Sequence, residues 1–445
     1  MLERILRILQ KSNLFLTGGG GVGKSYIVRE VIKRYESQGA VVAKLSSTAV
    51  SAVNIGGMTL HSFFKLGRSK NLEELKLYDA AHRSNLSFLK MILQGCELIV
   101  IDEISMVSGE LLELVKHRLK QCESQAKLLF VGDFFQLPPV GKEDAFAFES
   151  KAWAEFKPFC VELTQPKRTS EAELFAALNK VRRGEIDDEV ARLFESRLNL
   201  QPPQDATVLF SRRDSVEKRN TLCLGAPQFS SKASIEVKQK SFSQTALEEW
   251  VNNLVIPRVF EFKLGAKVIF CANKAGEFYN GEQGVIEQID KESKALFVRK
   301  NNGTSVVVTP TQTQKIEYKL VKKKVTEEVV ATFTQFPLCL AYAITIHKSQ
   351  GMSLPLFVCD LNRIFASGQS YVALSRATSL QGLFLQADVS KYPSFKEFLQ
   401  RKVRANEKVK EFYAACNMVD EVSLQRLSEE DLQELLDAEG EKSLF

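Results

Sequence analysis

The stretch Leu14–Ser25, LFLTGGGGVGKS, decides the fold of the first part of this chain. Leu14–Thr17 is a short apolar run typical of a buried strand, and Lys24–Glu36 has the period of a helix, with Gly39 beyond its end. The glycine run between them fits G-x-x-x-x-G-K-[ST], in which backbone amides converge on phosphate oxygens at a helix amino terminus. We therefore predict a nucleotide phosphate site at Gly18, Gly19, Gly20, Gly21, Val22, Gly23, Lys24, Ser25 and Tyr26.

Two further strand ends supply groups that hydrolysis requires. In LIVIDEIS, Asp102 and Glu103 follow an apolar run, so they lie at the carboxyl edge of a buried strand, where ligands bind in α/β sheets. Lys24 would reach the β and γ phosphates, while Ser25 and Asp102 would hold Mg²⁺. Glu103 would polarise the attacking water, and Gln136 in KLLFVGDFFQLPPV would sense the γ-phosphate. Together these motifs predict an enzyme that hydrolyses nucleoside triphosphates.

Strands and helices alternate on both sides of a β-rich stretch. The runs VVAKLSS, CELIVIDE and KLLFVGD, with helical segments between them, predict a parallel sheet that is buried on both faces. A second α/β set begins near DATVLF and resumes at PLCLAYAITIHKSQG, LFVCD, GQSYVALSRA and LFLQAD. From about residue 228 to residue 333, short strand-like runs and turn signals such as Asn280-Gly281 predict a small all-β module. In SEEDLQELL, the capping-box spacing of Ser428 and Asp431 predicts a terminal helix.

The charge of the chain is distributed unevenly. The 445 residues carry a formal charge of +6, but nine acidic and two basic residues between Asp420 and Phe445 give that segment −7 and leave +13 for residues 1–419. A basic body favours a polyanionic partner, although surface lysines also serve solubility. The acidic end is either a solubilising segment, which we favour, or a protein-docking element.

Other classes of protein are disfavoured by composition. No apolar stretch approaches the length of about 18 residues that a membrane span requires, and charges interrupt MLERILRILQKS, unlike a signal peptide. We expect a cytoplasmic enzyme with no membrane partner, nucleoid-associated in a bacterium and nuclear or mitochondrial in a eukaryote. Eight cysteines without a C-x-x-C pair and four scattered histidines favour buried free thiols over disulfides or a zinc site.

Five blocks resemble the Pif1 family of superfamily 1 helicases in their order and approximate spacing: GGGGVGKS, LIVIDEISMVSGELLELV, VGDFFQLPPV, AITIHKSQGMSL and GQSYVALSRA. The resemblance covers about residues 12–387, and DEISMVSGELL and GDFFQLPPV are more similar to Pif1 than to the related RecD-like helicases. It implies an α/β fold with two RecA-like parallel-sheet motor domains, with ATP and Mg²⁺ as cofactors. It also implies 5′-to-3′ movement on single-stranded DNA and unwinding of forked or structured DNA, including G-quadruplex or R-loop substrates. We expect the motor to be monomeric.

The resemblance also implies domain boundaries. It places a RecA-like domain 1A at residues 1–165, with 65–89 as a candidate 1B wedge, and a RecA-like domain 2A at 166–227 and 334–400. An SH3-like, β-rich 2B insertion would occupy residues 228–333, and a helical acidic tail would occupy 401–445.

Further site residues come only from the family likeness. Arg168 in VELTQPKRT and Arg376 in VALSRA would act as arginine fingers that reach the γ-phosphate across the cleft between the motor domains, and Gly351 would border the nucleotide. Hydroxyl groups and lysine can hold DNA phosphates, and histidine and phenylalanine rings can stack on bases, although core packing is the alternative for His61 and Phe63. The DNA-contacting candidates are Thr48, Thr59, His61, Ser62, Phe63, Thr345, His347 and Lys348.

The chain departs from the family pattern at three places. Thr169 stands where Gln usually follows the arginine, Ala49 stands where Gly is usual, and the upstream Gln that reads adenine has no clear counterpart. The preference for ATP therefore follows from the family alone. Two other classes stay open from sequence: a RecD-like or Dda-like DNA-stimulated translocase that hardly separates strands, and a P-loop kinase or switch protein, which would leave GDFFQLPP, HKSQG and VALSRA without a role.

Overall fold

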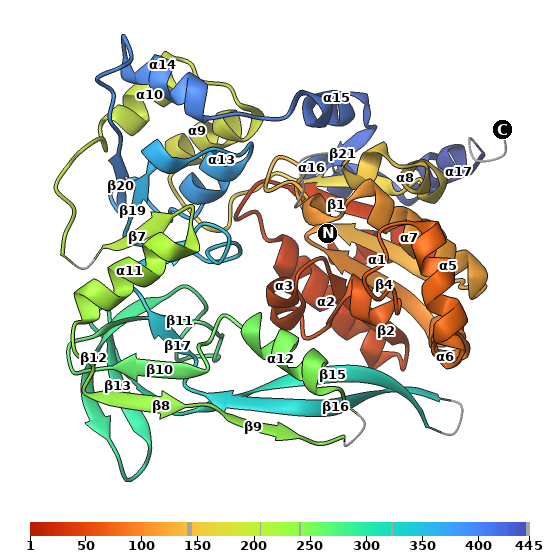
Figure 1. The fold of residues 1–445 in the computed structure, drawn as a ribbon. Helices are drawn as coiled ribbons and strands as arrows, with labels where there is room; N and C mark the ends of the chain where they lie inside the picture. The colour runs from red at the N-terminus through yellow and green to blue at the C-terminus, as the bar shows by residue number, and fades with distance from the viewer. Residues whose placement is uncertain (140–144, 205, 240–241, 322–323, 442–445) are drawn as a thin grey trace. The chain divides into compact units, whose positions relative to one another are not determined.

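The computed structural model describes residues 1–139, 145–204, 206–239, 242–321 and 324–441, and the chain divides into two compact units (Figure 1). The first unit consists of Met1–Pro166, Ile316–Val329 and Asn406–Phe445, and the second consists of Lys167–Lys315 and Val330–Ala405. This division differs from the expected one, because part of the expected insertion and most of the expected tail belong to the first unit. None of the helices in the described ranges combines the length and apolar character needed to span a membrane.

A seven-stranded parallel sheet forms the centre of the first unit, in the order β21-β6-β1-β5-β4-β2-β3. Leu16 is in register with Val131, and Ile101 is in register with Phe130, so the carboxyl ends of three motif-bearing strands lie at one edge. The strands are β1 (Leu14–Gly18), β2 (Val41–Ser46), β3 (Met58–Thr59), β4 (Cys96–Asp102), β5 (Lys127–Val131), β6 (Phe159–Leu163) and β21 (Met418–Asp420).

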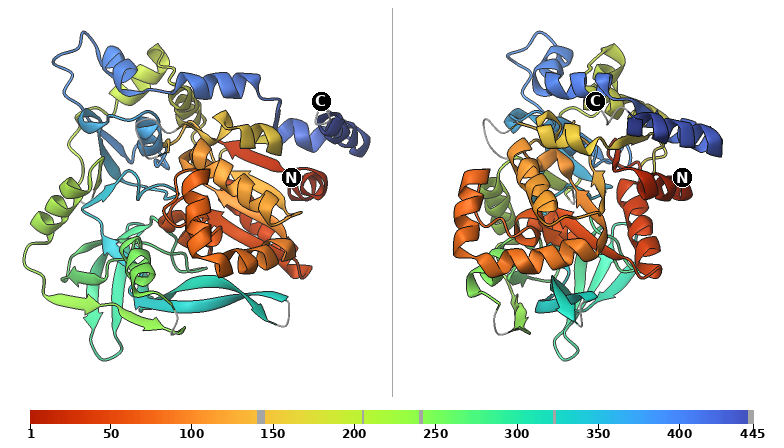
Figure 2. Two further views of the ribbon diagram at one scale, coloured as in Figure 1. Left: turned by 45° about the vertical axis from the view of Figure 1, so that its right-hand side comes forward. Right: turned by 90° about the vertical axis from the view of Figure 1, so that its right-hand side faces the viewer.

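Helices of the first unit come from both ends of the described sequence. Arg4 donates to Glu429 at 2.9 Å and to the carbonyl of Leu427 at 2.7 Å, so α1 and α17 lie side by side (Figure 2). The predicted capping box is confirmed, because the Ser428 hydroxyl accepts from the Asp431 amide at 3.0 Å and the Asp431 carboxylate accepts from the Ser428 amide at 3.1 Å. The helices are α1 (Leu2–Lys11), α2 (Lys24–Ser37), α3 (Ala49–Asn54), α4 (Leu60–Phe63), α5 (Leu72–Ala81), α6 (Arg83–Gly95), α7 (Gly109–Gln121), α8 (Lys151–Phe156), α15 (Glu407–Ala415), α16 (Glu421–Arg426) and α17 (Glu429–Glu441), with 3-10 turns η1 (Ile104–Met106) and η2 (Ala147–Glu149).

The second unit contains a smaller parallel sheet in the order β18-β7-β19-β20. Its strands are β7 (Thr207–Phe210), β18 (Ala343–Thr345), β19 (Phe357–Asp360) and β20 (Leu383–Gln386). Helix α11 packs on β7 and β18, while α9 packs on α10 and α13. The helices are α9 (Ala172–Arg183), α10 (Asp188–Glu195), α11 (Arg213–Leu224), α12 (Gln244–Asn252), α13 (Gln369–Leu374) and α14 (Phe395–Lys402), with η3 (Leu361–Arg363).

A β-rich module is inserted between β7 and β18. Five antiparallel strands in the order β14-β13-β12-β11-β17 surround a core that includes Val268, Phe270, Ile286, Leu296 and Val298, and β8 pairs with β10 beside them. Its strands are β8 (Phe229–Lys232), β9 (Ser234–Val237), β10 (Val259–Phe262), β11 (Lys267–Phe270), β12 (Gln283–Asp290), β13 (Ala295–Lys300), β14 (Ser305–Val308), β15 (Thr311–Val321), β16 (Lys324–Gln335) and β17 (Leu338–Leu340). A further sheet of this module has three strands, in the order β15-β16-β9.

The segment Ile316–Val329, which belongs to β15 and β16, is part of the first unit. Strand β3 pairs with β2 at Leu45 and Ser46, and the earlier backbone groups of β2 have no strand partner on that side among the residues that the structure describes. The Tyr318 hydroxyl donates to the Val42 carbonyl at 2.9 Å and accepts from the Lys44 amide at 3.3 Å. A single side chain thus satisfies two backbone groups at the edge of β2.

Candidate nucleotide and DNA site

The P-loop follows β1 directly and ends in α2. Gly23 has φ of 96° and caps α2, a left-handed conformation that glycine adopts without strain. A Cβ atom on Gly18 would lie 2.3 Å from the Leu163 carbonyl oxygen of β6, so this position requires glycine. Lys24 Nζ donates to the carbonyls of Gly18 at 2.6 Å and Gly19 at 2.9 Å. The loop therefore has the backbone geometry and the ammonium group that a phosphate site needs.

Asp102 and Glu103 lie where β4 ends, at the same sheet edge. Burial raises the pKa of Asp102 to about 6, while the Glu103 amide at 2.9 Å and the positive charge of Lys24 act in the opposite direction. A half-buried carboxylate near a lysine and a phosphate loop fits Mg²⁺, which usually takes one or two carboxylates together with substrate phosphates. Ser25 in the first turn of α2 offers the hydroxyl ligand. Glu103 has φ of 54°, a strained conformation that is frequent at functional sites.

Gln136 reaches this edge through the loop after β5. The Gly132 amide donates to the Leu16 carbonyl at 3.2 Å, which ties the start of the loop to the strand that carries the P-loop. The Gln136 amide donates to the Asp133 carbonyl at 2.9 Å, and the Asp133 carboxylate accepts from the Phe135 amide at 3.2 Å. Within the first unit, the predicted catalytic residues Lys24, Asp102, Glu103 and Gln136 are therefore at the carboxyl edge of one parallel sheet.

Arg168 and Arg376 lie close together in the second unit. Arg376 is only 2% exposed and donates to carbonyls of Ser349 at 3.2 Å and Met352 at 3.3 Å, in the loop that contains Gly351. Arg168 donates to the Ser375 carbonyl at 2.6 Å, and Arg376 donates to the Ser375 hydroxyl at 2.8 Å. Burial and the neighbouring charge of Arg376 lower the pKa of Arg168. A negative group near these two guanidinium groups would relieve their repulsion.

The DNA candidates of the first unit occupy the starts of two short helices. The Thr48 hydroxyl accepts from the Ser51 amide at 3.2 Å and caps α3, and the Thr59 hydroxyl accepts from the Ser62 amide at 3.3 Å and caps α4. His61 is exposed, whereas Ser62 is half-buried. These positions leave His61 available for contact with a ligand, while the two threonines also have a structural role.

The expectation that Phe63 stacks on DNA bases is not supported by the structure. Its ring is 3% exposed and packs edge-on against Phe64 and Tyr318, with centroid distances of 5.0 and 5.4 Å. Apolar burial explains the difference, because the side chain of Phe63 on α4 points into the interior of the first unit rather than into the solvent. Phe63 is therefore a core residue of the first unit in this structure.

The DNA candidates of the second unit lie around the end of β18. The Thr345 hydroxyl accepts from the Lys348 amide at 3.1 Å, and His347 is exposed between them. Thr345 and Lys348 line a cavity of about 420 Å³, whose other walls include Arg213, Asn220, Arg258, Cys339 and Met352. Basic and hydroxyl groups at one cavity are suited to a phosphate backbone.

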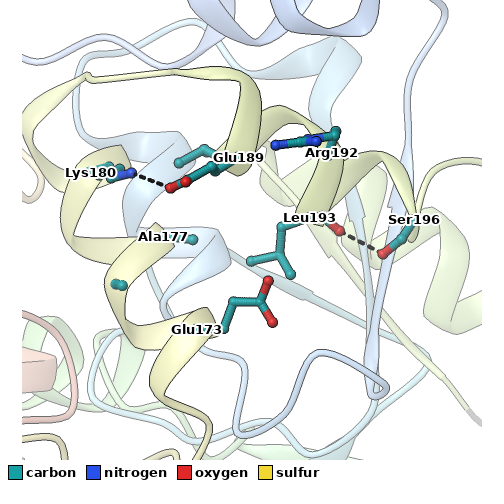
Figure 3. A pocket seen from close by; sticks show the side chains of 9 residues that line it. Glu173, Ala177, Lys180, Glu189, Arg192, Leu193 and Ser196 are labelled. Atoms are coloured by element: carbon teal, nitrogen blue, oxygen red, sulfur yellow. Dashed lines mark hydrogen bonds and ion pairs between the residues drawn. The ribbon is translucent and has the colours of Figure 1, made fainter.

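A larger cavity of about 630 Å³ lies between α9 and α10 and contains none of the predicted site residues (Figure 3). Lys180 at its border pairs with Glu189 at 3.0 Å, and Ala177 and Leu193 belong to its lining. All eight cysteines are free in the structure, but only Cys96, Cys122, Cys160 and Cys359 are buried, whereas the other four are half-buried. The Sγ atoms of Cys271 and Cys339 are 3.2 Å apart.

Two residues in the first unit were not predicted from the sequence. Tyr413 of α15 contacts the loops of the nucleotide site. Arg118 of α7 is 1% exposed, pairs through both terminal nitrogens with Asp79 at 2.6 Å and donates to the Phe64 carbonyl at 3.0 Å. Neither residue lies in a recognisable motif, and their partners are distant in sequence, so only the tertiary structure reveals them.

The fold and the site define a P-loop nucleotide hydrolase with one parallel sheet in each of two units. A family described as PIF1-like helicase matches residues 2–192. The chain is 38% identical over 441 residues to the ATP-dependent DNA helicase Pif1 of Campylobacter jejuni. The alignment covers 94% of this chain and 98% of that protein. It is 31% identical to human ATP-dependent DNA helicase PIF1 over 94% of this chain but only 63% of the human protein. The chain belongs to the Pif1 helicase family.

Solved structures show the same relationship. Bacteroides Pif1 in complex with ADP-AlF4 matches with a TM-score of 0.79 and 26% identity, over 93% of this chain and 96% of that one. The Pif1 helicase of Candida albicans matches with a TM-score of 0.68 and 30% identity, over 93% and 98% of the two chains. The family resemblance and the α/β fold class expected from the sequence are thereby confirmed.

Proposed function

We propose that this chain is an ATP-dependent DNA helicase that moves 5′ to 3′ on single-stranded DNA and unwinds forked duplexes. The observation that carries the proposal is the meeting of Lys24, Asp102 and Gln136 at one sheet edge of a Pif1-family chain. A Bacteroides relative is described with single-stranded DNA, and another structure is described with forked duplex DNA. A P-loop kinase or switch protein would not account for the family membership of the whole chain.

The residues of the first unit would bind and activate the nucleotide. Lys24 would exchange its carbonyl partners in the loop for the β and γ phosphates, and the amides of the P-loop would hold the remaining oxygens. Glu103 would orient the attacking water, and Gln136 would contact the γ-phosphate. Mg²⁺, when bound, would neutralise phosphate charge, with Asp102 and Ser25 as the residues that hold it. We propose that Arg168 and Arg376 of the second unit stabilise the charge that develops in the transition state.

The DNA contacts would be independent of base sequence. Thr48, Thr59 and Lys348 would hold phosphates, so affinity should fall as salt concentration rises. His61 and His347 are exposed and would stack on bases of any identity. Phe63 is not included among the stacking residues, because its ring is buried.

The test compares two lysine variants of α2. Lys24→Ala should abolish ATP hydrolysis and unwinding while leaving affinity for single-stranded DNA unchanged, because the substitution removes only the phosphate-binding ammonium. Lys33→Ala is the matched control, since Lys33 is on the same helix and exposed. Unwinding by the Lys24→Ala variant would overturn the mechanism.

Polarity requires a separate substrate series. Forks that carry only a 5′ tail should be unwound in the presence of ATP and Mg²⁺, and duplexes with only a 3′ tail should not. Unwinding restricted to 3′-tailed substrates would contradict the proposed direction. ATP hydrolysis that DNA stimulates without any strand separation would instead identify a translocase.

We also propose that the motor works as a monomer, and sedimentation of the active complex with DNA tests this proposal.

A further inference from the structure

Tyr413, a half-buried residue, places its hydroxyl group between the two strand ends that carry the P-loop and Gln136. Its Oη atom is 2.7 Å from the Thr17 hydroxyl at the end of β1. It accepts from the Phe134 amide at 3.2 Å and donates to the Asp133 carboxylate at 3.4 Å. A phenol has one donor and two acceptor positions, and the three contacts are satisfied together when the Thr17 hydroxyl donates.

The groups that Tyr413 joins have no access to water. Thr17 and Asp133 are both 0% exposed, so their polar atoms depend on protein partners. Loss of a partner inside a protein is poorly compensated, because solvent cannot replace the hydrogen bond. The Tyr413 hydroxyl is therefore expected to restrict where these two residues lie.

Aromatic packing fixes α15 in the place that this network requires. The Tyr413 ring stacks on Phe135 with a centroid distance of 4.8 Å and an interplanar angle of 13°. The neighbouring ring of Phe412 stacks on Phe148 at 4.4 Å and meets Phe134 edge-on at 5.4 Å. Phenylalanine at position 413 would keep the stacking but not the hydrogen bonds, so the hydroxyl has a separable role.

The network leads directly to the chemistry of the nucleotide site. Thr17 precedes Gly18, whose carbonyl holds Lys24, and the Asp133 carbonyl accepts from the Gln136 amide at 2.9 Å. We propose that Tyr413 is a positioning residue for ATP hydrolysis, which orients Gln136 through Asp133 and fixes the approach to the P-loop through Thr17. The inference rests on the proposed ATPase function and extends it to a segment outside the helicase motifs.

Helix α15 is the first element of the first unit after the chain leaves the second unit. The second unit ends at Ala405, and α15 begins at Glu407 after the cap Asn406. The chain that returns from the second unit therefore enters the first unit at the nucleotide edge, with Tyr413 as its polar contact there. Lys408 on the same helix pairs with Glu149, which adds a second attachment.

The test measures single-stranded-DNA-stimulated ATP hydrolysis by the full chain. Tyr413→Phe should lower kcat about fivefold, because small misplacements of catalytic groups have large effects on rate. The KM for ATP should stay within about twofold, since ground-state binding depends mainly on the P-loop. Tyr392→Phe makes the same chemical change in the second unit and should leave both constants unchanged.

A double variant separates positioning from general destabilisation. Because Tyr413 acts partly through Gln136, Tyr413→Phe should cause a smaller loss of kcat in a Gln136→Ala background than in the wild-type chain, and the remaining loss belongs to the Thr17 contact. Full additivity of the two losses, or an unchanged kcat for a folded Tyr413→Phe variant, would overturn the inference. If Tyr413→Phe does not fold, Thr17→Val removes the opposite hydroxyl, and an unchanged kcat in that variant would overturn it equally. Failure of the wild-type chain to hydrolyse ATP would instead refute the proposed function.

Discussion

Replacement of Arg118 by methionine should destabilise the first unit strongly. Arg118 on α7 reaches the end of α4 and the helix α5, because its guanidinium contacts Asp79 and the carbonyls of Phe64 and Lys65. Methionine keeps much of the aliphatic stem and removes the charge and the five donors. The change therefore tests the polar contacts rather than the packing of the side chain.

The magnitude follows from burial. Removal of one partner of a buried ion pair costs about 3–5 kcal/mol, and the lower part of that range applies because the Asp79 side chain is 19% exposed and can be partly hydrated. Unpaired carbonyls in the interior add about 1 kcal/mol. We expect a loss of about 3–4 kcal/mol, which corresponds to a decrease of about 10 °C in the melting temperature for a unit of this size.

The assay must report on the first unit alone, because two units need not unfold together. The sequence has two tryptophans, Trp153 in the first unit and Trp250 in the second, so a Trp250→Phe background makes Trp153 fluorescence specific. Lys90→Met breaks the exposed pair with Glu123 in the same unit and should cost less than about 1 kcal/mol. An Arg118→Met variant as stable as the Lys90→Met variant would refute the reasoning.

Three other predictions test contacts elsewhere. Burial and the charge of Arg118 lower the pKa of His117, so an NMR titration should show a higher pKa of His117 in the Arg118→Met variant. Because the lowered pKa favours the neutral imidazole in the folded state, the native first unit should lose stability as the pH falls below about 6.5, where the histidine of the unfolded chain becomes protonated. Dilute hydrogen peroxide should convert the Cys271 and Cys339 thiols into a disulfide with release of two waters, seen by mass spectrometry as the loss of two hydrogens, and Cys271→Ser should prevent it. Tyr318→Phe should lower the melting temperature of the Trp153 transition by an amount equivalent to about 1–3 kcal/mol, because two backbone groups of β2 lose their partner; an unchanged transition would contradict this role.

Local sequence patterns were sufficient where structure is decided by neighbouring residues. The predicted strand and helix around the P-loop correspond to β1 and α2 within about a residue, and α7 is the helical segment predicted between CELIVIDE and KLLFVGD. The β-rich stretch predicted at about residues 228–333 contains β12 and β13, whose branched apolar residues and flanking turn residues are both strand signals. The placement of Asp102 after an apolar run was also enough to predict its sheet edge.

Features that depend on distant contacts were not predictable in this way. Strand β21 has only the residues Met418–Asp420, too few for a period, and it becomes a strand because it pairs with β6. The burial of Phe63 depends on Tyr318, which is more than two hundred residues away in the chain. Tyr413 carries no motif, and its importance appears only when α15 packs on the loop that contains Phe135.

The division of the first unit into three chain segments has a consequence for its biosynthesis. Residues 1–166 leave the ribosome long before residues 316–329 and the helices α15 to α17, so the edge strand β21 and the aromatic ring of Phe412 are absent when the other strands first meet. Contacts between such distant parts of a sequence form slowly, because long loops must close first. The nascent first unit should therefore expose the free edge of β6 and apolar surface throughout most of translation. We expect it to depend on holding chaperones until the final segment is released.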